Sequence, residues 1–191
     1  MDHVPTPSQT VGPFFHFELT TKEHAVPRIA GPQVQGERLW LKIRVLDADG
    51  APLSDAMIEI WQADAQGKYN HPDDPQAAKP EAGWRGFGRL GTDENGECEF
   101  ETIRPGRVPG PGGARQAPHL NVAVFARGML KQLYTRIYFA GDAANAEDPA
   151  LALVPADRRS TLLAQPDPAR PGGWGFVLRL QGDQETVFFD V

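Results

Sequence analysis

Histidine and tyrosine are the residues of this chain best suited to hold a metal, and their positions single out one of each. The five histidines and three tyrosines are His3, His16, His24, His71, His119, Tyr69, Tyr134 and Tyr138. Only His119 and Tyr69 stand where a strand of the expected fold meets a loop. A hard trivalent cation prefers anionic oxygen and imidazole, so this pair is the beginning of a candidate metal site.

The rest of a metal shell is missing beside His119. Residues i and i+2 of a strand share a face, so a second ligand next to His119 would fall at Asn121. A neutral amide is a poor ligand for a trivalent cation. From the residues alone, His119 is therefore interpreted as a hydrogen-bonded structural residue, with a metal ligand as the alternative.

Other kinds of catalytic site have weaker support. Ser8, Ser54 and Ser160 lie in no nucleophile-elbow context. The single cysteine, Cys98, lies on the expected core face of a strand, which favours a small core residue over a reactive thiol. No glycine-rich segment follows a strand and opens a helix, so a phosphate-binding loop of that kind is not expected.

Length and charge limit the partners. The chain has 191 residues, a formal net charge of −6 and no run of basic residues, which predicts one domain and argues against a nucleic-acid partner. No apolar run approaches the roughly 18 residues that a membrane helix needs. The first residues lack a basic and then apolar leader, so we expect a cytoplasmic protein with no membrane association.

The elements that must position these residues are mostly strands. Short segments of alternating apolar and polar residues, separated by turn signals, predict an all-β fold of the sandwich type. These segments are residues 39–47, 57–62, two strands within 90–103, 119–126, 132–139, 174–181 and 187–190. A hairpin is expected across Arg127 and Gly128, and residues 149–164 have a helical composition that Pro155 would interrupt.

The first 36 residues are expected to form an arm outside the sandwich domain of residues 37–191. Five prolines and the lack of a periodic pattern predict an extended arm or ordered loop, with a flexible tail as the alternative. Phe14, Phe15 and Phe17 favour the ordered arm, because three aromatic residues in four positions need a surface to cover, either the core or a partner subunit.

Several longer motifs resemble the intradiol ring-cleavage dioxygenases in order and spacing. They are residues 6–14 (TPSQTVGPF), 58–64 (IEIWQAD), 67–71 (GKYNH), 92–96 (TDENG), 102–106 (TIRPG), 117–119 (APH) and 133–139 (LYTRIYF). The ending at 182–190 (GDQETVFFD) resembles the non-iron subunit of the family's two-subunit members.

The resemblance implies a β-sandwich of the intradiol type with long loops and short helical excursions. It also implies an enzyme built from alpha and beta chains of similar fold. Such an enzyme opens protocatechuate between its hydroxyls with O2, giving 3-carboxy-cis,cis-muconate. The family holds ferric iron with two tyrosinates and two histidines.

When the four ligand positions of the family are matched to this sequence, two of them carry residues that cannot serve as these ligands. Tyr69 matches the first Tyr and His119 the first His, whereas the second Tyr falls at Val108 and the second His at Asn121. The resemblance therefore implies a vestigial metal site that binds no iron in this chain, with Fe3+ held by a partner beta chain.

The resemblance also assigns substrate contacts to this chain. The N-terminal loop positions Thr10, Gly12 and Pro13 match residues that wall the substrate pocket. Arg136 matches an arginine that reaches it, whereas from sequence alone a surface salt bridge would be favoured.

Three functions remain open at this point. The first is the non-iron subunit of a protocatechuate-cleaving enzyme. The second is a homo-oligomeric intradiol dioxygenase with altered iron ligands, which a wine-red colour of the chain alone would reveal. The third is a non-catalytic β-sandwich binding module, which co-purification with a homologous chain would exclude.

Overall fold

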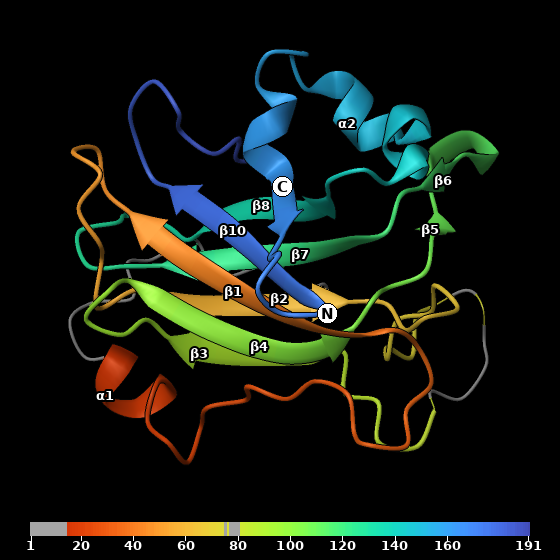
Figure 1. Cartoon of the computed structure of the whole chain (residues 1–191), viewed down its shortest axis with the longest axis horizontal. Helices are drawn as coiled ribbons and strands as arrows, with labels where there is room; N and C mark the ends of the chain where they lie inside the picture. Colours follow the sequence, from red (N-terminus) through yellow and green to blue (C-terminus); the bar gives the residue numbers. More distant parts are fainter. Residues whose placement is uncertain (1–14, 75, 77–80) are drawn as a thin grey trace, which may run out of the picture.

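Alternating side chains account for the strands of this protein. The computed structural model describes residues 15–74, 76 and 81–191 (Figure 1). In β1 (Arg38–Leu46), Leu39, Leu41 and Ile43 are buried on one face. Lys42 and Arg44 lie on the other face and are exposed. Each long strand thus buries one face and leaves the other available for a site.

The remaining strands are short and evenly distributed along the chain. They are β2 (Met57–Gln62), β3 (Phe87–Gly91), β4 (Glu97–Ile103), β5 (Val108–Pro109), β6 (Arg115–Gln116), β7 (His119–Phe125), β8 (Leu133–Phe139), β9 (Leu163–Pro166) and β10 (Gly173–Arg179). The helical segments are α1 (Phe15–Leu19), η1 (Pro111–Gly113), η2 (Ala143–Glu147), α2 (Pro149–Leu153) and η3 (Arg159–Leu162). No helix in the described part of the chain is long and apolar enough to cross a membrane.

The long strands make two layers of a sandwich. One layer has the order β3-β2-β7-β8 and the other β9-β10-β1-β4, with β5 and β6 paired separately. The two layers are connected at one edge, where Tyr138 and Phe139 of β8 pair with β9. The all-β sandwich expected from the sequence is confirmed.

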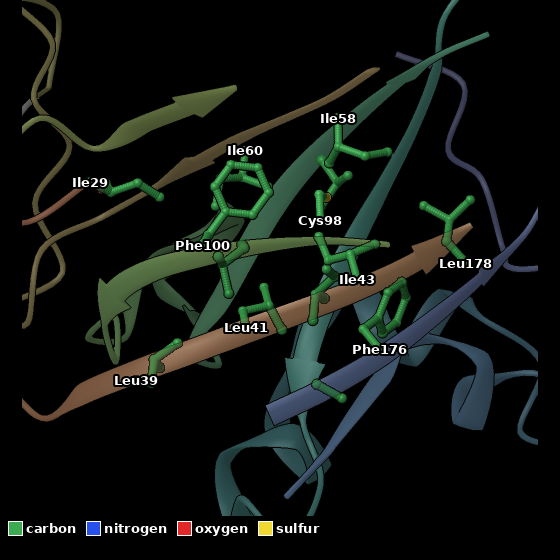
Figure 2. Packing of buried hydrophobic residues seen from close by; sticks show 14 of the residues in the cluster. Ile29, Leu39, Leu41, Ile43, Ile58, Ile60, Cys98, Phe100, Phe176 and Leu178 are labelled. Carbon is green, nitrogen blue, oxygen red and sulfur yellow. The ribbon is translucent and has the colours of Figure 1, made fainter. Parts of the chain in front are cut away.

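The core fills the space between these layers. Side chains of β1, β4 and β10 point toward those of β2 (Figure 2). Phe100, Ile60 and Leu41 are fully buried there. Cys98 is buried among them, and burial raises the pKa of its thiol to about 12, so the prediction of a small core residue is confirmed.

One strand prediction is shifted in its bounds and one is wrong. The two strands expected within residues 90–103 form as β3, which begins earlier at Phe87, and β4, and because β3 pairs with β2 and β4 with β1 they lie in opposite layers. Residues 187–190 make only an isolated bridge, between Phe189 and Tyr134, and not a strand. The reason is that strand pairing depends on partners far away in the sequence, which a local alternating pattern does not specify.

The helical prediction for residues 149–164 is correct in its first part. α2 ends before Pro155, as expected, and η3 follows it. The last two residues, Leu163 and Ala164, belong instead to β9 and connect the two layers.

The described part of the N-terminal arm packs on the sandwich of its own chain. Val26 forms a bridge with Arg89 of β3, and Ile29, Ala30 and Val34 are buried in the main core. The short helix α1, which the sequence pattern did not predict, precedes this segment.

Candidate functional site

Three neighbouring strands bring the candidate site residues into one row. In the register of the sheet, Trp61 of β2 lies opposite Asn121 of β7, and Asn121 lies opposite Arg136 of β8. His119 lies opposite Tyr138 one step further along. Because residues two apart share a face, this row lies on the face turned away from the main core.

A tight loop after β2 supplies Tyr69. The Asp64 carboxylate accepts backbone N–H groups of Gln66 and Lys68, both at 2.9 Å, and thereby fixes the turn. Gly67 in this turn has φ +82°, and a Cβ there would overlap the Arg107 carbonyl oxygen. Only glycine fits this close approach, which places the ring of the next-but-one residue against the sheet.

Tyr69 contacts both Trp61 and Asn121. Its ring is stacked on that of Trp61, with centroids 6.0 Å apart and planes 7° apart. Asn121 Nδ2 donates to the Tyr69 hydroxyl at 3.2 Å and to the Trp61 carbonyl at 3.3 Å. Burial raises the pKa of Tyr69, although the Asn121 hydrogen bond and Arg136 act in the opposite direction, so the phenol is neutral near pH 7.

His119 is a buried neutral imidazole. It is 2% exposed, and its Nδ1–H donates to the Ala117 carbonyl at 2.8 Å, which fixes the tautomer. Burial, with a smaller contribution from the Arg136 charge, lowers its pKa to about 4. Its ring lies 5.6 Å from that of Tyr138, whose pKa burial raises to about 12.

Arg136 lies at the centre of this cluster. Its Nη1 donates to the Gln116 side-chain oxygen at 2.6 Å and to the Tyr138 hydroxyl at 3.3 Å. Its guanidinium also stands over the Phe189 ring at 5.9 Å. Gln116 in turn pairs with Val108, so the β5–β6 ribbon joins the cluster.

All four positions that match family iron ligands are accounted for. Tyr69 and Asn121 are in direct contact, His119 is on the same strand face as Asn121, and Val108 is 3% exposed beside Gln116. The loop positions Thr10, Gly12 and Pro13, and also Phe14, lie outside the described residues.

These residues do not fit a ferric centre. Val108 has no donor atom, and the Asn121 amide nitrogen is used as a hydrogen-bond donor. The positively charged Arg136, the register partner of Asn121, also acts electrostatically on Tyr69. Within residues 15–74, 76 and 81–191, no group of three or more His, Cys, Asp or Glu side chains is arranged to bind a metal.

Asp148 supports the site but was not identified from the sequence. It is 1% exposed, caps α2 through the N–H groups of Ala150 and Leu151, and also accepts the Ala117 N–H at 2.6 Å and the Tyr138 hydroxyl at 3.2 Å. Asp followed by Pro is the signal of a helix N-cap and could have located the start of α2. No local sequence pattern indicates its hydrogen bonds to Ala117, between β6 and β7, and to Tyr138 of β8.

Surface hollows lie on both layers of the described part of the sandwich. A small one of about 170 Å³ borders the site and is lined by Trp61, Asn121 and Tyr134 among others. A larger one of about 540 Å³ lies on the other layer, between η3, β1 and β10, and includes Arg44 and Arg179. The larger hollow contains none of the expected site residues.

Comparison with known proteins identifies the family of this chain. The family model described as Dioxygenase matches residues 10–181. The chain is 44% identical to the protocatechuate 3,4-dioxygenase alpha chain of Burkholderia cepacia, over 97% of each chain, and 39% identical to that of Pseudomonas putida, over 97% and 96%. It is 34% identical to the beta chain of Burkholderia cepacia, over 79% of this chain and 67% of that one.

Solved structures agree with the sequence relatives. The dioxygenase domain of a carbohydrate-binding fusion protein from Streptomyces sp. SirexAA-E matches 94% of this chain and 99% of its own, with a TM-score of 0.62 and 26% identity. The fold is also that of 3-chlorocatechol 1,2-dioxygenase from Rhodococcus opacus, with a TM-score of 0.64, 23% identity and coverage of 94% and 68%. This chain belongs to the intradiol dioxygenase family.

Proposed function

We propose that this chain is the alpha subunit of a protocatechuate 3,4-dioxygenase and works as a hetero-oligomer with a homologous beta chain. The observation that carries the proposal is the end-to-end similarity to two alpha chains, at 44% and 39% identity over 97% of this chain. The similarity to a beta chain is lower and partial. The complex would take protocatechuate and O2 and release 3-carboxy-cis,cis-muconate.

Within this proposal the ferric iron belongs to the beta chain. The buried Val108 and the donating amide of Asn121 support that assignment, since neither supplies an anionic ligand. The absence of iron from this chain remains a prediction, which metal analysis tests.

The proposed role of this chain is to bind and orient the substrate at the subunit interface. Thr10, Gly12 and Pro13 would form one wall, where Gly12 permits close approach to a planar ring and Pro13 limits the entropy lost on binding. Arg136 would supply positive charge to a carboxylated substrate. Its Nη1 is committed to Gln116 and Tyr138, while Nε and Nη2 have no acceptor among the described residues.

Two further parts of the proposal concern organisation. We divide the chain into an arm, residues 1–36, that packs on the core and on the partner, and a sandwich domain, residues 37–191. We also assign the complex to the cytoplasm, in keeping with a single buried cysteine.

The proposal is tested by co-expressing this chain with the homologous chains encoded by the same organism. A tagged copy of this chain should retain a homologous chain that has both tyrosines and both histidines, and only the complex should consume O2 in the presence of protocatechuate. The iron should be found in the retained chain. A red, iron-containing sample of this chain alone would support the homo-oligomeric alternative, and failure to retain any homologue would support a binding module.

A further inference from the structure

Arg136 is linked, directly or through one neighbour, to all four positions that match iron ligands. Across the sheet it is the register partner of Asn121, where the second His is lost. Through Nη1 it holds Gln116 at 2.6 Å, and Gln116 is the register partner of Val108, where the second Tyr is lost. The guanidinium is therefore connected to both substituted positions.

The two retained positions are each linked to the guanidinium through one neighbouring residue. Tyr138, which Arg136 holds at 3.3 Å, lies opposite His119 in the register. Tyr69 is attached to Asn121 at 3.2 Å. The positive charge of Arg136 acts to lower the pKa of both Tyr69 and His119.

We propose that the Arg136 guanidinium takes the place of a metal cation in this chain and bars ferric iron from the site even when the two lost ligands are restored. Its repulsion of a trivalent ion is three times that of a unit charge at the same distance. Displacing it would also break charge-assisted bonds to Gln116 and Tyr138. The missing ligands at Val108 and Asn121 and the positive charge of Arg136 would therefore each oppose iron binding independently.

The first test restores the ligands with and without the guanidinium. The double variant Val108→Tyr/Asn121→His of the full chain should stay colourless and free of iron. Adding Arg136→Gln, which keeps a hydrogen-bonding side chain without charge, should give a visible tyrosinate-to-iron absorption band and about one iron per chain. Circular dichroism and cooperative unfolding confirm that each variant is folded.

A matched control distinguishes the effect of the positive charge at position 136 from the effect of side-chain size. Adding Arg136→Lys to the double variant keeps the positive charge and should leave the chain without iron. Stoichiometric iron in the double variant, or in the Lys version, would overturn the proposal. So would a folded Gln version that binds no iron.

A second experiment avoids placing the larger Tyr side chain at the buried position of Val108, where it could prevent folding. Asn121→His alone is compared with Asn121→His/Arg136→Gln in a titration with Co2+, whose visible bands report binding. The variant without the guanidinium should bind Co2+ at least about tenfold more tightly, because a nearby positive charge has been removed. Equal affinities, or no binding by either, would overturn the proposal.

Discussion

At the scale of single residues, His119 makes folding sensitive to acid. Its pKa is about 4 in the folded chain and 6.5 in the unfolded one, so the unfolded state takes up the proton first. Stability should be fully present above pH 6.5, fall as the pH is lowered, and reach its full loss near pH 4. A shift of this size corresponds to roughly 3 kcal/mol.

Urea denaturation at several pH values measures this loss. His119→Gln removes the titrating group but retains a donor near the Ala117 carbonyl, so its stability should depend less on pH in that window. An unchanged slope in this variant would mean that other groups cause the acid sensitivity.

Arg136 is the residue on which the proposed substrate contact depends. In the assembled complex, Arg136→Ala should lower kcat/KM by about tenfold to 150-fold, the value of one charge-assisted contact of roughly 1.5 to 3 kcal/mol. Arg136→Lys should recover only part, since a planar fork of donors is lost. Steady-state kinetics with iron measured in the same sample is the test, and the iron content should not change.

A wild-type kcat/KM in Arg136→Ala would restrict the substrate contacts of this chain to the N-terminal loop. That result would leave the further inference intact, because metal exclusion is measured on this chain alone.

At the scale of elements, the loop after β2 depends on one glycine. Gly67→Ala should destabilise the chain by more than about 3 kcal/mol, because a left-handed φ of +82° is combined with overlap of the Arg107 carbonyl. Gly128, in the β7–β8 hairpin, has φ +79° but open space around it.

Gly128→Ala is therefore the matched control for Gly67→Ala. It should cost only about 1 to 2 kcal/mol, the strain of a left-handed residue without a clash. Thermal unfolding of both variants separates the two contributions. Equal costs would show that the contact with Arg107 does not hold the Tyr69 loop.

At the scale of the whole molecule, we expect association with the beta chain through a large apolar interface. Obligate interfaces bury about 2,000 Å² or more. The sequence places Phe14, Phe15 and Phe17 close together in the arm, where we expect them to provide apolar surface for the partner. Phe17 is 64% exposed in this chain. Phe17→Glu should weaken association at micromolar concentration by about tenfold or more, as measured by sedimentation.

Leu130→Glu is the comparison for this prediction. Leu130 is 86% exposed at the β7–β8 hairpin, outside the arm, so its substitution should leave association unchanged. Chains that remain separate when mixed at micromolar concentration would contradict the hetero-oligomer itself.

The alternating pattern of the sequence was enough to locate most of the strands. Alternation predicted β1, β2, β7 and β8 closely, because one buried face imposes a period of two on each strand. Motif positions also predict that Val108 and Asn121 replace metal ligands, because ligand type is a property of single residues.

Which residues meet in the site depends on the tertiary structure. The row of Trp61, Asn121 and Arg136, the separation of β3 from β4 and the role of Asp148 depend on pairings between segments 15 to 60 residues apart. Local periodicity carries no information on such register, which is set by packing of the whole sandwich. The sequence therefore predicts which ligands are replaced, and the fold shows that Arg136 pairs with Asn121 and bonds to Gln116, the register partner of Val108.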